Sequence, residues 1–504
     1  MTATLLSQRS AGVVLHPTSL PGPHGSGDLG PHAYYFVDWL HGAGQTLWQT
    51  LPLGPVGPGY SPYMGSSAFA GNPMLVALEP LVARGWLSDS SDASDFDPLR
   101  VDFQIVLPWR MTRLREAFSG FSVQATDQER QALADWAAAQ RHWLDDYALF
   151  MALDQAHAPA LWPQWPHGLA RRDAGALVTA RHTYAAEIAF WVFVQWQFDL
   201  QWHALKTYAN GKGVGLVGDL PIFVAHHSAD CWARPDLYRL DAQGQPSVVA
   251  GVPPDFFSAT GQRWGNPLYN WDAMQGDGYA WWVARVKRQL DLADVIRIDH
   301  FRGFVDYWEI PADEPTAVKG RWQPGPGMAL FDVLTQALGQ LPIIAEDLGL
   351  ITPEVLALRE ATGFPGMRVL EFAFSGDAGH PFLPHNYAPN TVVYTGTHDN
   401  DTVLGWWANC SRRERALALQ YLGSDGTDMH WALIRAAWMS VARLALCQFQ
   451  DVLGLDGSHR MNTPGTLGCW TWRFSWDWVG PQAAGRLGNL TAASGRGRFD
   501  LLTL

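Results

Sequence analysis

The sequence predicts an α/β fold, a (β/α)8 TIM barrel with mostly helical insertions between the barrel strands. Short runs rich in apolar and β-branched residues alternate with segments whose apolar residues recur about every 3.6 positions. Repeated strand–helix alternation favours a parallel barrel over other α/β folds. The length of 504 residues fits one barrel with insertions, so we expect a single barrel domain over residues 1–504.

The barrel prediction rests on eight short runs of the type that forms buried strands. In chain order the predicted strands are Gly12–Leu20, Thr46–Leu53, Val214–Val224, Val295–Phe301, Pro342–Leu348, Met367–Phe374, Thr391–Asp399 and Asp451–Leu455. The predicted helices are His32–Gly44, Ala185–Asn210, Tyr279–Ala293, Ala329–Gln340, Pro353–Thr362 and Arg413–Gln450.

The region from about residue 72 to 205 is too long for one strand–helix unit. Glu129–Leu153 has a helical pattern, and tryptophan-rich turns occur near Trp162–Trp165. We therefore predict a mostly helical insertion subdomain that rises from the barrel.

Composition excludes several classes of partner. The net charge is −13 and no basic block occurs, so we expect no nucleic-acid partner and no anionic membrane surface. The chain contains neither an apolar run long enough to span a bilayer nor the apolar core of a signal peptide. The 4 cysteines are widely spaced, as free thiols in a reducing compartment would be, and we expect a cytoplasmic protein. The 26 tryptophans suit both core packing and stacking on sugar rings.

The stretch Val295–Phe301 places charged residues in a buried strand. Because side chains alternate between the faces of a strand, Arg297 and Asp299 are predicted to point the same way. The guanidinium is expected to lower the pKa of Asp299 and keep it ionised, as a carboxylate nucleophile requires. The alternative is a buried ion pair that serves packing alone.

Acidic residues follow four of the predicted strands, at Asp219, Asp299, Glu346 and Asp399. A single such acid could be the N-cap of the next helix. Four of them at the carboxyl ends of barrel strands predict one shared site. No metal-ligand spacing and no phosphate-binding glycine motif accompanies these acids, so we expect no metal and no cofactor.

Paired carboxylates of this kind are typical of retaining chemistry at a glycosidic bond. One acid must be ionised and act as the nucleophile, while the other must be protonated and act as the general acid. Asp299 beside Arg297 is the better anion, and Glu346 in its apolar run is the better acid.

Several motifs resemble those of known glucan-active enzymes. The segments Gly-Asp-Leu-Pro, Arg-Ile-Asp-His, Ala-Glu-Asp-Leu-Gly and Thr-His-Asp-Asn, at 218–221, 297–300, 345–349 and 397–400, resemble the α-amylase superfamily. The longer segments 15–23, 66–73 and 251–269 resemble the amylomaltases, the 4-α-glucanotransferases of glycoside hydrolase family 77. This likeness extends from Gly12 to Arg473.

The resemblance implies a role for each matching residue. It implies that Asp299 is the nucleophile, Glu346 the general acid/base and Asp399 the acid that stabilises the transition state. It implies that the donor sugar is lined by Tyr63, Asp219, Arg297 and His398. The other positions that it implies for substrate binding are Ser61, Asp255, Trp264, Asn266, Asp347, Phe372 and Asn462. From the residues alone, Trp264 and His398 could equally be core side chains.

The resemblance further implies the reaction and its substrates. In the family an α-1,4-glucan is cut, held as a covalent glucosyl-enzyme and passed to the 4-OH of another glucan. A loop from about 245 to 275 is expected to cover the cleft and exclude water, which suits transfer. The alternative is that this loop is a surface excursion packed by its own side chains. We expect glucan substrates and a monomer or simple homodimer.

Three other functions stay open from the residues. A hydrolase or another transglycosylase could use the same acids, and an isomerase could act within one disaccharide. A catalytically idle carbohydrate-binding protein is the alternative from another class, although such a protein would be expected to have lost an acid.

The chain departs from the family pattern at four positions. Pro58 stands in place of an aromatic residue, Tyr60 of an acid and Met64 of an amide. The resemblance therefore does not carry over to an outer aromatic surface for long glucans. Cys469 stands where the family often has asparagine. None of these four departures alters the three acids.

Overall fold

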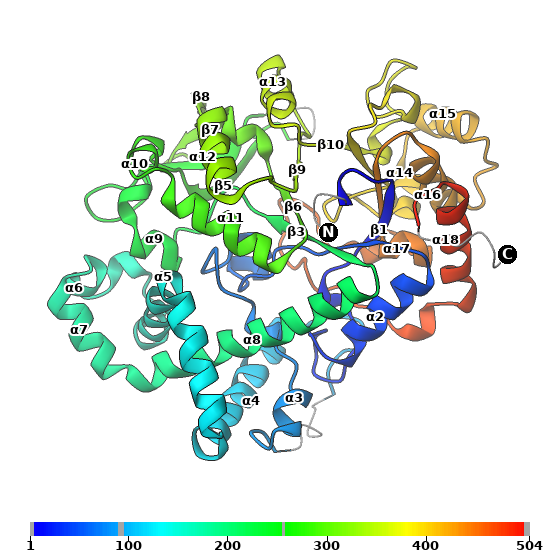
Figure 1. The fold of residues 1–504 in the computed structure, drawn as a ribbon. Coiled ribbons are helices and arrows are strands. Elements are labelled where there is room, and N and C mark those ends of the chain that lie inside the picture. Colours follow the sequence, from blue (N-terminus) through cyan, green and yellow to red (C-terminus); the bar gives the residue numbers. More distant parts are fainter. Residues whose placement is uncertain (1–4, 89–94, 255–257, 498–504) are drawn as a thin grey trace.

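Eight parallel strands close into a barrel in the computed structural model, which describes residues 5–88, 95–254 and 258–497 (Figure 1). The order around the barrel is β1-β12-β11-β10-β9-β6-β3-β2. The strands are β1 Ser10–Val14, β2 Leu47–Gln49, β3 Gly215–Leu220, β6 Val295–Ile298, β9 Ile343–Ala345, β10 Gly366–Val369, β11 Thr391–Tyr394 and β12 Leu444–Gln448. The predicted fold class is confirmed.

Apolar side chains fill the barrel, so that it has a packed core. Each strand supplies at least one member of a buried cluster: Val14, Leu47, Val217, Val295, Ile344, Met367, Val369, Val392, Tyr394, Leu444 and Leu446. Neighbouring positions, such as Val13, belong instead to the larger core between the strands and the helices. Both faces of each strand are therefore buried, which explains the nearly continuous apolar runs in the sequence.

The predicted eighth strand was wrong. Asp451–Leu455 overlaps helix α17 (Phe449–Leu453), and the strand that closes the barrel is Leu444–Gln448, inside the predicted helix Arg413–Gln450. The sequence of β12, Leu-Ala-Leu-Cys-Gln, has no β-branched residue and is rich in good helix formers. Pairing with β1 and β11 on both sides overrides that local preference.

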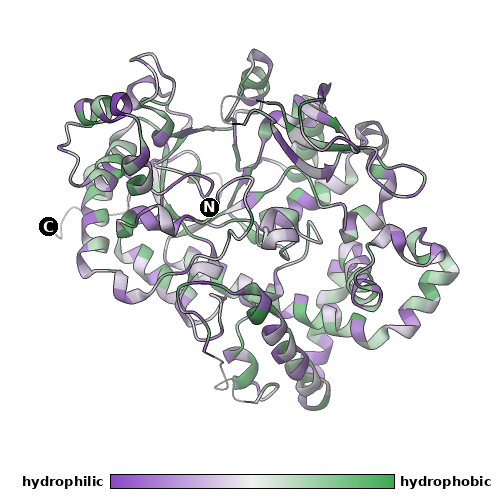
Figure 2. Cartoon of the chain, turned by 180° about the vertical axis from the view of Figure 1, so that it is seen from behind, coloured by the Kyte–Doolittle hydropathy of each residue, from purple (hydrophilic) through white to green (hydrophobic). Residues whose placement is uncertain are grey.

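Helices surround the barrel, and hydrophilic and hydrophobic residues alternate along them, as Figure 2 shows. This pattern is typical of helices with one buried face. Besides α17, they include α2 Pro31–Gly42, α8 Ala185–Gly211, α9 Ala229–Ala233, α10 Trp271–Gly276, α11 Ala280–Leu292, α12 Met328–Leu338, α13 Pro353–Thr362, α14 Val403–Asn409, α15 Arg412–Leu422, α16 Met429–Met439 and α18 Pro481–Ala493.

Five further α-helices lie between β2 and α8 in the described part of the chain, and Figure 1 shows them below and to the left of the barrel. They are α3 Glu79–Ala83, α4 Phe103–Gln124, α5 Asp127–His157, α6 His167–Ala170 and α7 Ala174–Thr183. The start of α5 is set by a capping box, in which Thr126 and Glu129 bond to each other's backbone N–H groups. The long helix α8 packs against α5 and leads back to β3.

A second sheet of four antiparallel strands, in the order β5-β4-β7-β8, was missed by the sequence analysis. Its strands are β4 Val248–Val252, β5 Gln262–Pro267, β7 Asp306–Pro311 and β8 Arg321–Pro324. The buried carboxylate of Glu309 is paired with Arg239 at 3.2 Å and Arg321 at 2.6 Å. Because β4 and β5 pair antiparallel, much of the described part of the 245–275 segment is β-structure.

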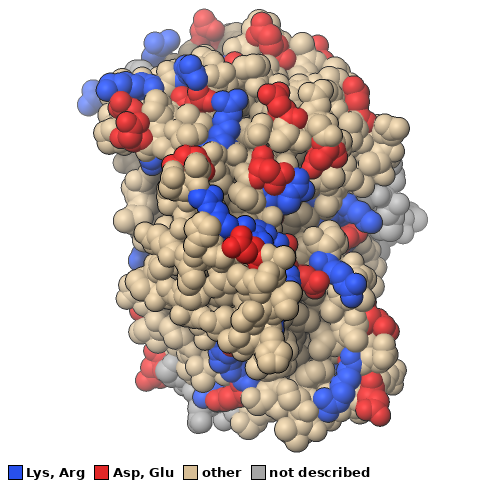
Figure 3. Space-filling model, turned by 90° about the vertical axis from the view of Figure 1, so that its left-hand side faces the viewer, with Lys and Arg blue, Asp and Glu red and all other residues tan. Residues whose placement is uncertain are grey.

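The surface carries charges of both signs. On the face drawn in Figure 3, lysine and arginine alternate with aspartate and glutamate, and a broad area carries neither. Among the described residues, no helix is long and apolar enough to cross a membrane.

Candidate active site

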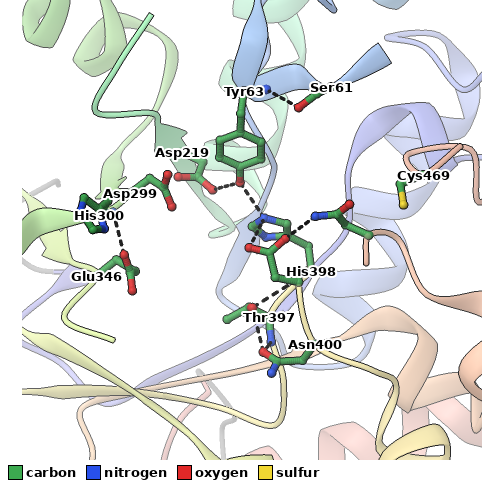
Figure 4. Close-up of polar contacts among 12 residues, drawn as sticks. Ser61, Tyr63, Asp219, Asp299, His300, Glu346, Thr397, His398, Asn400 and Cys469 are labelled. Atoms are coloured by element: carbon green, nitrogen blue, oxygen red, sulfur yellow. Dashed lines mark hydrogen bonds and ion pairs between the residues drawn. The ribbon is translucent and has the colours of Figure 1, made fainter. Parts of the chain in front are cut away.

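Polar side chains from several barrel strands meet at the carboxyl ends of those strands (Figure 4). Asp219 lies in β3 and Arg297 in β6, while Glu346 and His398 follow β9 and β11. Figure 4 shows Tyr63 reaching this group from the segment after β2. The predicted convergence of strand ends is what brings these residues, distant in sequence, into one site.

Arg297 links two carboxylates and is itself buried. Its Nη1 donates to both oxygens of Asp219, at 2.7 and 2.8 Å, and its Nη2 donates to Oδ1 of Asp299 at 3.1 Å. The side chain of Asp219 is 0% exposed, whereas that of Asp299 is 29% exposed. Asp219 thus neutralises the guanidinium from within the protein, and Asp299 is the carboxylate that stays open to a ligand.

The expected lowering of the Asp299 pKa was wrong. Burial raises the pKa of Asp299, Arg297 lowers it, and the negative charges of Asp219, Glu346 and Asp399 raise it as well; the net pKa is about 8. The sequence analysis considered the neighbouring cation and left out the neighbouring anions. Bidentate pairing with Asp219 also means that Arg297 is shared between two carboxylates.

Two backbone N–H groups hold the carboxyl group of Glu346. The N–H of His300 donates to Oε2 at 2.6 Å, and the N–H of Leu348 donates to Oε1 at 3.0 Å. His300 has left-handed backbone angles (φ 52°, ψ 51°), which are unusual for a residue other than glycine. Burial raises the pKa of Glu346 despite these hydrogen bonds and Arg297, as suits a general acid.

The role of the His300 backbone was missed by the sequence analysis. A histidine at a strand end gives no sign that its backbone adopts a positive φ or that its N–H faces a carboxyl group. Local strain of this kind is concentrated at functional sites.

Tyr63 and His398 extend the polar network away from Arg297. The hydroxyl of Tyr63 donates to Oδ2 of Asp219 at 2.7 Å and lies 2.8 Å from Nε2 of His398. Since its only hydrogen is given to Asp219, Nε2 of His398 must be the donor in the second contact. Burial lowers the pKa of His398, so this imidazole is neutral and carries its hydrogen on Nε2.

Asp399 completes the network at the other end. Its Oδ2 lies 3.4 Å from Nε2 of His398, and its Oδ1 accepts a hydrogen bond of 2.6 Å from Nδ2 of Asn462. Polar contacts are therefore continuous from Asp299 to Asp399 by way of Arg297, Asp219, Tyr63 and His398.

Three of the other predicted site residues lie around this network. The N–H of Tyr63 donates to Oγ of Ser61 at 3.2 Å, so Ser61 caps the short helix Pro62–Met64 that carries Tyr63. Trp264 lies on β5 with its ring edge-on to that of His300, at 4.9 Å between centroids. Asn266 donates to the carbonyl of Val224 at 2.9 Å.

Phe372 and Asp347 differ in their surroundings. Phe372 is 37% exposed in the short helix Leu370–Phe372 and lies 6.1 Å from the ring of Phe382. The carboxylate of Asp347 is buried, accepts from the N–H of Met367 at 2.6 Å and pairs with Arg359. Its contacts are structural, and the network above does not include it. Asp255 lies outside the described residues.

The positions that depart from the family pattern make local contacts. The ring of Tyr60 stacks on Phe103 at 4.5 Å between centroids. Sδ of Met64 lies 3.3 Å from Nδ2 of Asn266. Sγ of Cys469 accepts from the N–H of Thr463 at 3.3 Å, and so holds the loop that contains Asn462.

Possible metal ligands come together at one place among the described residues, formed by His24, Asp28 and Glu79. Arg110 lies 3.1 Å from Asp28 and places a positive charge in this group. None of these residues contributes to the network of Asp299 and Glu346.

The geometry defines a class of enzyme: a (β/α)8 barrel with several carboxylic acids at the carboxyl ends of its strands, suited to glycosidic bonds. The model of glycoside hydrolase family 77, described as 4-alpha-glucanotransferase, matches residues 15–477. The 4-alpha-glucanotransferases of Thermus thermophilus and Synechocystis are 49% and 47% identical over 497 and 499 residues, which cover 97% and 98% of this chain and 99% of each relative.

A solved structure, the amylomaltase from Streptococcus agalactiae in complex with acarbose, has a TM-score of 0.94 at 37% identity, covering 97% of this chain and 100% of that one. The chain belongs to glycoside hydrolase family 77 and is a 4-α-glucanotransferase. The comparisons support transglycosylation and do not favour the hydrolase alternative.

Proposed function

We propose that Asp299 is the nucleophile of this transfer reaction, on the strength of one observation. Of the two carboxylates bonded to Arg297, Asp219 is enclosed and only Asp299 is open to a ligand. A pKa of about 8 leaves a minority of Asp299 ionised at neutral pH, and the contact with Nη2 of Arg297 favours this form, which attacks the anomeric carbon. Attack forms a covalent glucosyl-enzyme and expels the rest of the donor glucan.

Glu346 acts as the general acid and then as the general base. Its raised pKa keeps a proton available for the oxygen of the leaving sugar. In the second step the carboxylate accepts the proton of the acceptor hydroxyl, which attacks the glucosyl-enzyme. The hydrogen bonds from His300 and Leu348 hold the carboxyl group in place for both steps. Asp399, fixed by Asn462, stabilises the charge that develops on the sugar ring.

The substrates are α-1,4-glucans such as maltooligosaccharides and amylose, with the 4-OH of a second glucan or glucose as acceptor. This proposal is supported by the relative that was solved with acarbose. Tyr63, Asp219, Arg297 and His398 bind the donor sugar, and Trp264 on β5 supplies an aromatic surface beside His300. The segment 245–275 covers the cleft and excludes water.

The protein functions in the cytoplasm, as a monomer or simple homodimer, on starch- or glycogen-derived maltodextrins. The four free cysteines, none of them paired in the structure, suit a reducing compartment.

Incubation with maltotriose tests the proposal. The expected result is released glucose together with a ladder of longer maltodextrins and little net gain of reducing ends. Rising reducing ends without longer chains would contradict transfer, and a single isomerised product would indicate an isomerase. Asp299→Ala and Glu346→Gln should abolish the ladder while far-UV circular dichroism stays unchanged. Asp145→Asn, an exposed acid on α5, should leave it intact.

A further inference from the structure

His16 lies next to the site but has no part in the reaction described above. It follows β1 and occupies the cap position of the short helix Pro17–Ser19, yet its side chain makes no capping hydrogen bond. The residue is 5% exposed, and its buried Nδ1 has no hydrogen-bond partner among the described residues. Buried polar groups normally have partners, so this atom needs an explanation.

His16 shares a small cavity with His398. Its volume is about 10 Å³, and its lining is mostly apolar, with polar groups from His16, Ser19, His398, Gln448 and Gln450. A cavity of roughly 10–15 Å³ with two or more polar partners is of the size that holds one water molecule. The two glutamines already donate elsewhere, Gln448 to the carbonyl of Asp401 and Gln450 to that of His459.

Both imidazoles are neutral. Burial lowers the pKa of His16 to about 3, with a further contribution from His398, and burial also lowers the pKa of His398. Because His398 donates from Nε2 to Tyr63, its Nδ1 carries a lone pair that can accept a hydrogen bond. A hydrogen bond at one imidazole nitrogen fixes the tautomer and the orientation of the whole ring.

We propose that His16 is a positioning residue, whose Nδ1 hydrogen-bonds through one water in the shared cavity to His398. The bond fixes the His398 ring, and through it the positions of Tyr63 and Asp399. The alternative is that His16 only fills space below the site. The proposal rests on the proposed role of Asp399.

Three substitutions separate the two readings. His16→Asn keeps an amide at the place of Nδ1, His16→Gln keeps one at the place of Nε2, and His16→Leu removes both polar atoms. Val13→Ala on the same strand is the matched control, because Val13 is buried in the outer core and does not line the cavity. Each variant is assayed for kcat and KM with maltotriose and for Tm.

Loss of positioning should lower kcat of His16→Leu by about tenfold or more, with KM within about twofold, while His16→Asn keeps at least about a third of wild-type kcat. His16→Gln should resemble His16→Leu. Val13→Ala should lower Tm without lowering kcat. In the ¹⁵N spectrum of histidine-labelled protein, the His398 signal (identified with His398→Asn) should change from the Nε2–H tautomer to a mixture in His16→Gln.

The proposal is overturned if His16→Leu keeps wild-type kcat, or if His16→Asn and His16→Gln are equally active. If His16→Leu does not fold, the comparison of the two amide variants decides the question. A wild-type protein that makes no maltodextrin ladder would overturn the proposed function itself. A normal ladder in the wild type and in every His16 variant would overturn the positioning role alone.

Discussion

Nδ2 of Asn462 lies 2.6 Å from Oδ1 of Asp399, although 63 residues separate the two in sequence. The amide comes from a loop whose turn is held by Sγ of Cys469, through the N–H of Thr463. The orientation of Asp399 thus depends on a segment outside the barrel strands, as well as on His398.

Removing this amide should impair catalysis more than folding. Asn462→Leu keeps the approximate size of the side chain but deletes a hydrogen bond to a charged group, a contact that contributes about 1.5–3 kcal/mol. The expected result is a fall in kcat with maltotriose of about 10–100-fold. Asn409→Leu is the control, since that amide donates to the carbonyl of Gly405 in its own helix, away from the acids. Equal activity of the two variants would show that Asp399 is oriented without Asn462.

Tyr63→Phe should break the network at its centre. The change removes a hydroxyl and leaves the carboxylate of Asp219 and the Nε2–H of His398 each without one partner. An unsatisfied buried group costs about 1–3 kcal/mol, so the transfer rate should fall about 5–100-fold.

The matched control for that substitution is Tyr208→Phe, which removes an exposed hydroxyl bonded to Asp38 at 2.7 Å. Initial rates of glucose release from maltotriose provide the measurement. A Tyr63→Phe variant as active as Tyr208→Phe would mean that His398 and Asp219 do not need the bridge.

Because the pKa of Asp299 is raised, we expect the ionisation of this residue to make the folding stability depend on pH. A carboxyl group whose folded-state pKa is raised above its ordinary value of about 3.9 stabilises the protein fully at low pH, and this contribution is lost as pH rises toward 8. Asp299→Asn removes the ionisable group. The Tm of the variant minus that of the wild type should therefore increase from pH 5 to pH 8.

Differential scanning calorimetry at pH 5, 6, 7 and 8 measures this difference. The control Asp145→Asn alters an exposed carboxylate on α5, and its Tm difference should stay nearly constant. If the Tm difference of Asp299→Asn instead stayed constant from pH 5 to pH 8, Asp299 would be ionised throughout that range, as the ion pair with Arg297 suggests from the sequence alone.

The sequence was informative where residues close in sequence determine the structure. Motifs at the ends of β3, β6, β9 and β11 located Asp219, Asp299, Glu346 and Asp399, because parallel strands of a barrel all end on the same face. The relative order of these strands follows from their alternation with helices.

Other features depend on contacts that no local pattern encodes. β12 is a strand because it pairs on both sides, against the preference of its own residues. The pKa of Asp299 depends on Asp219, Glu346 and Asp399, which come from other strand ends. The positive φ of His300 follows from the packing around Glu346. In each case the deciding partner lies far away in sequence.

The last prediction concerns Arg496, a buried arginine that follows α18 near the C-terminal end of the described residues. Its guanidinium donates to five backbone carbonyls, those of Ser10, Trp438, Ser440, Ala442 and Arg443, at 2.7–3.2 Å. These bonds connect the residues just after α18 to the segment before β12 and to the start of β1. Arg496 is 1% exposed, so its loss removes a buried donor from all five carbonyls, although Arg9 still donates to those of Trp438, Ser440 and Ala442.

Arg496→Met should therefore lower the free energy of unfolding by about 1–3 kcal/mol, the cost of leaving buried polar groups without a partner. Arg486→Met is the matched control, because Arg486 is an exposed arginine paired with Asp428 and such surface pairs contribute about 0–1 kcal/mol. Urea unfolding followed by tryptophan fluorescence measures both. A loss below about 1 kcal/mol for Arg496→Met would mean that water replaces the guanidinium at these carbonyls, and that the closure of the barrel between β12 and β1 does not depend on it.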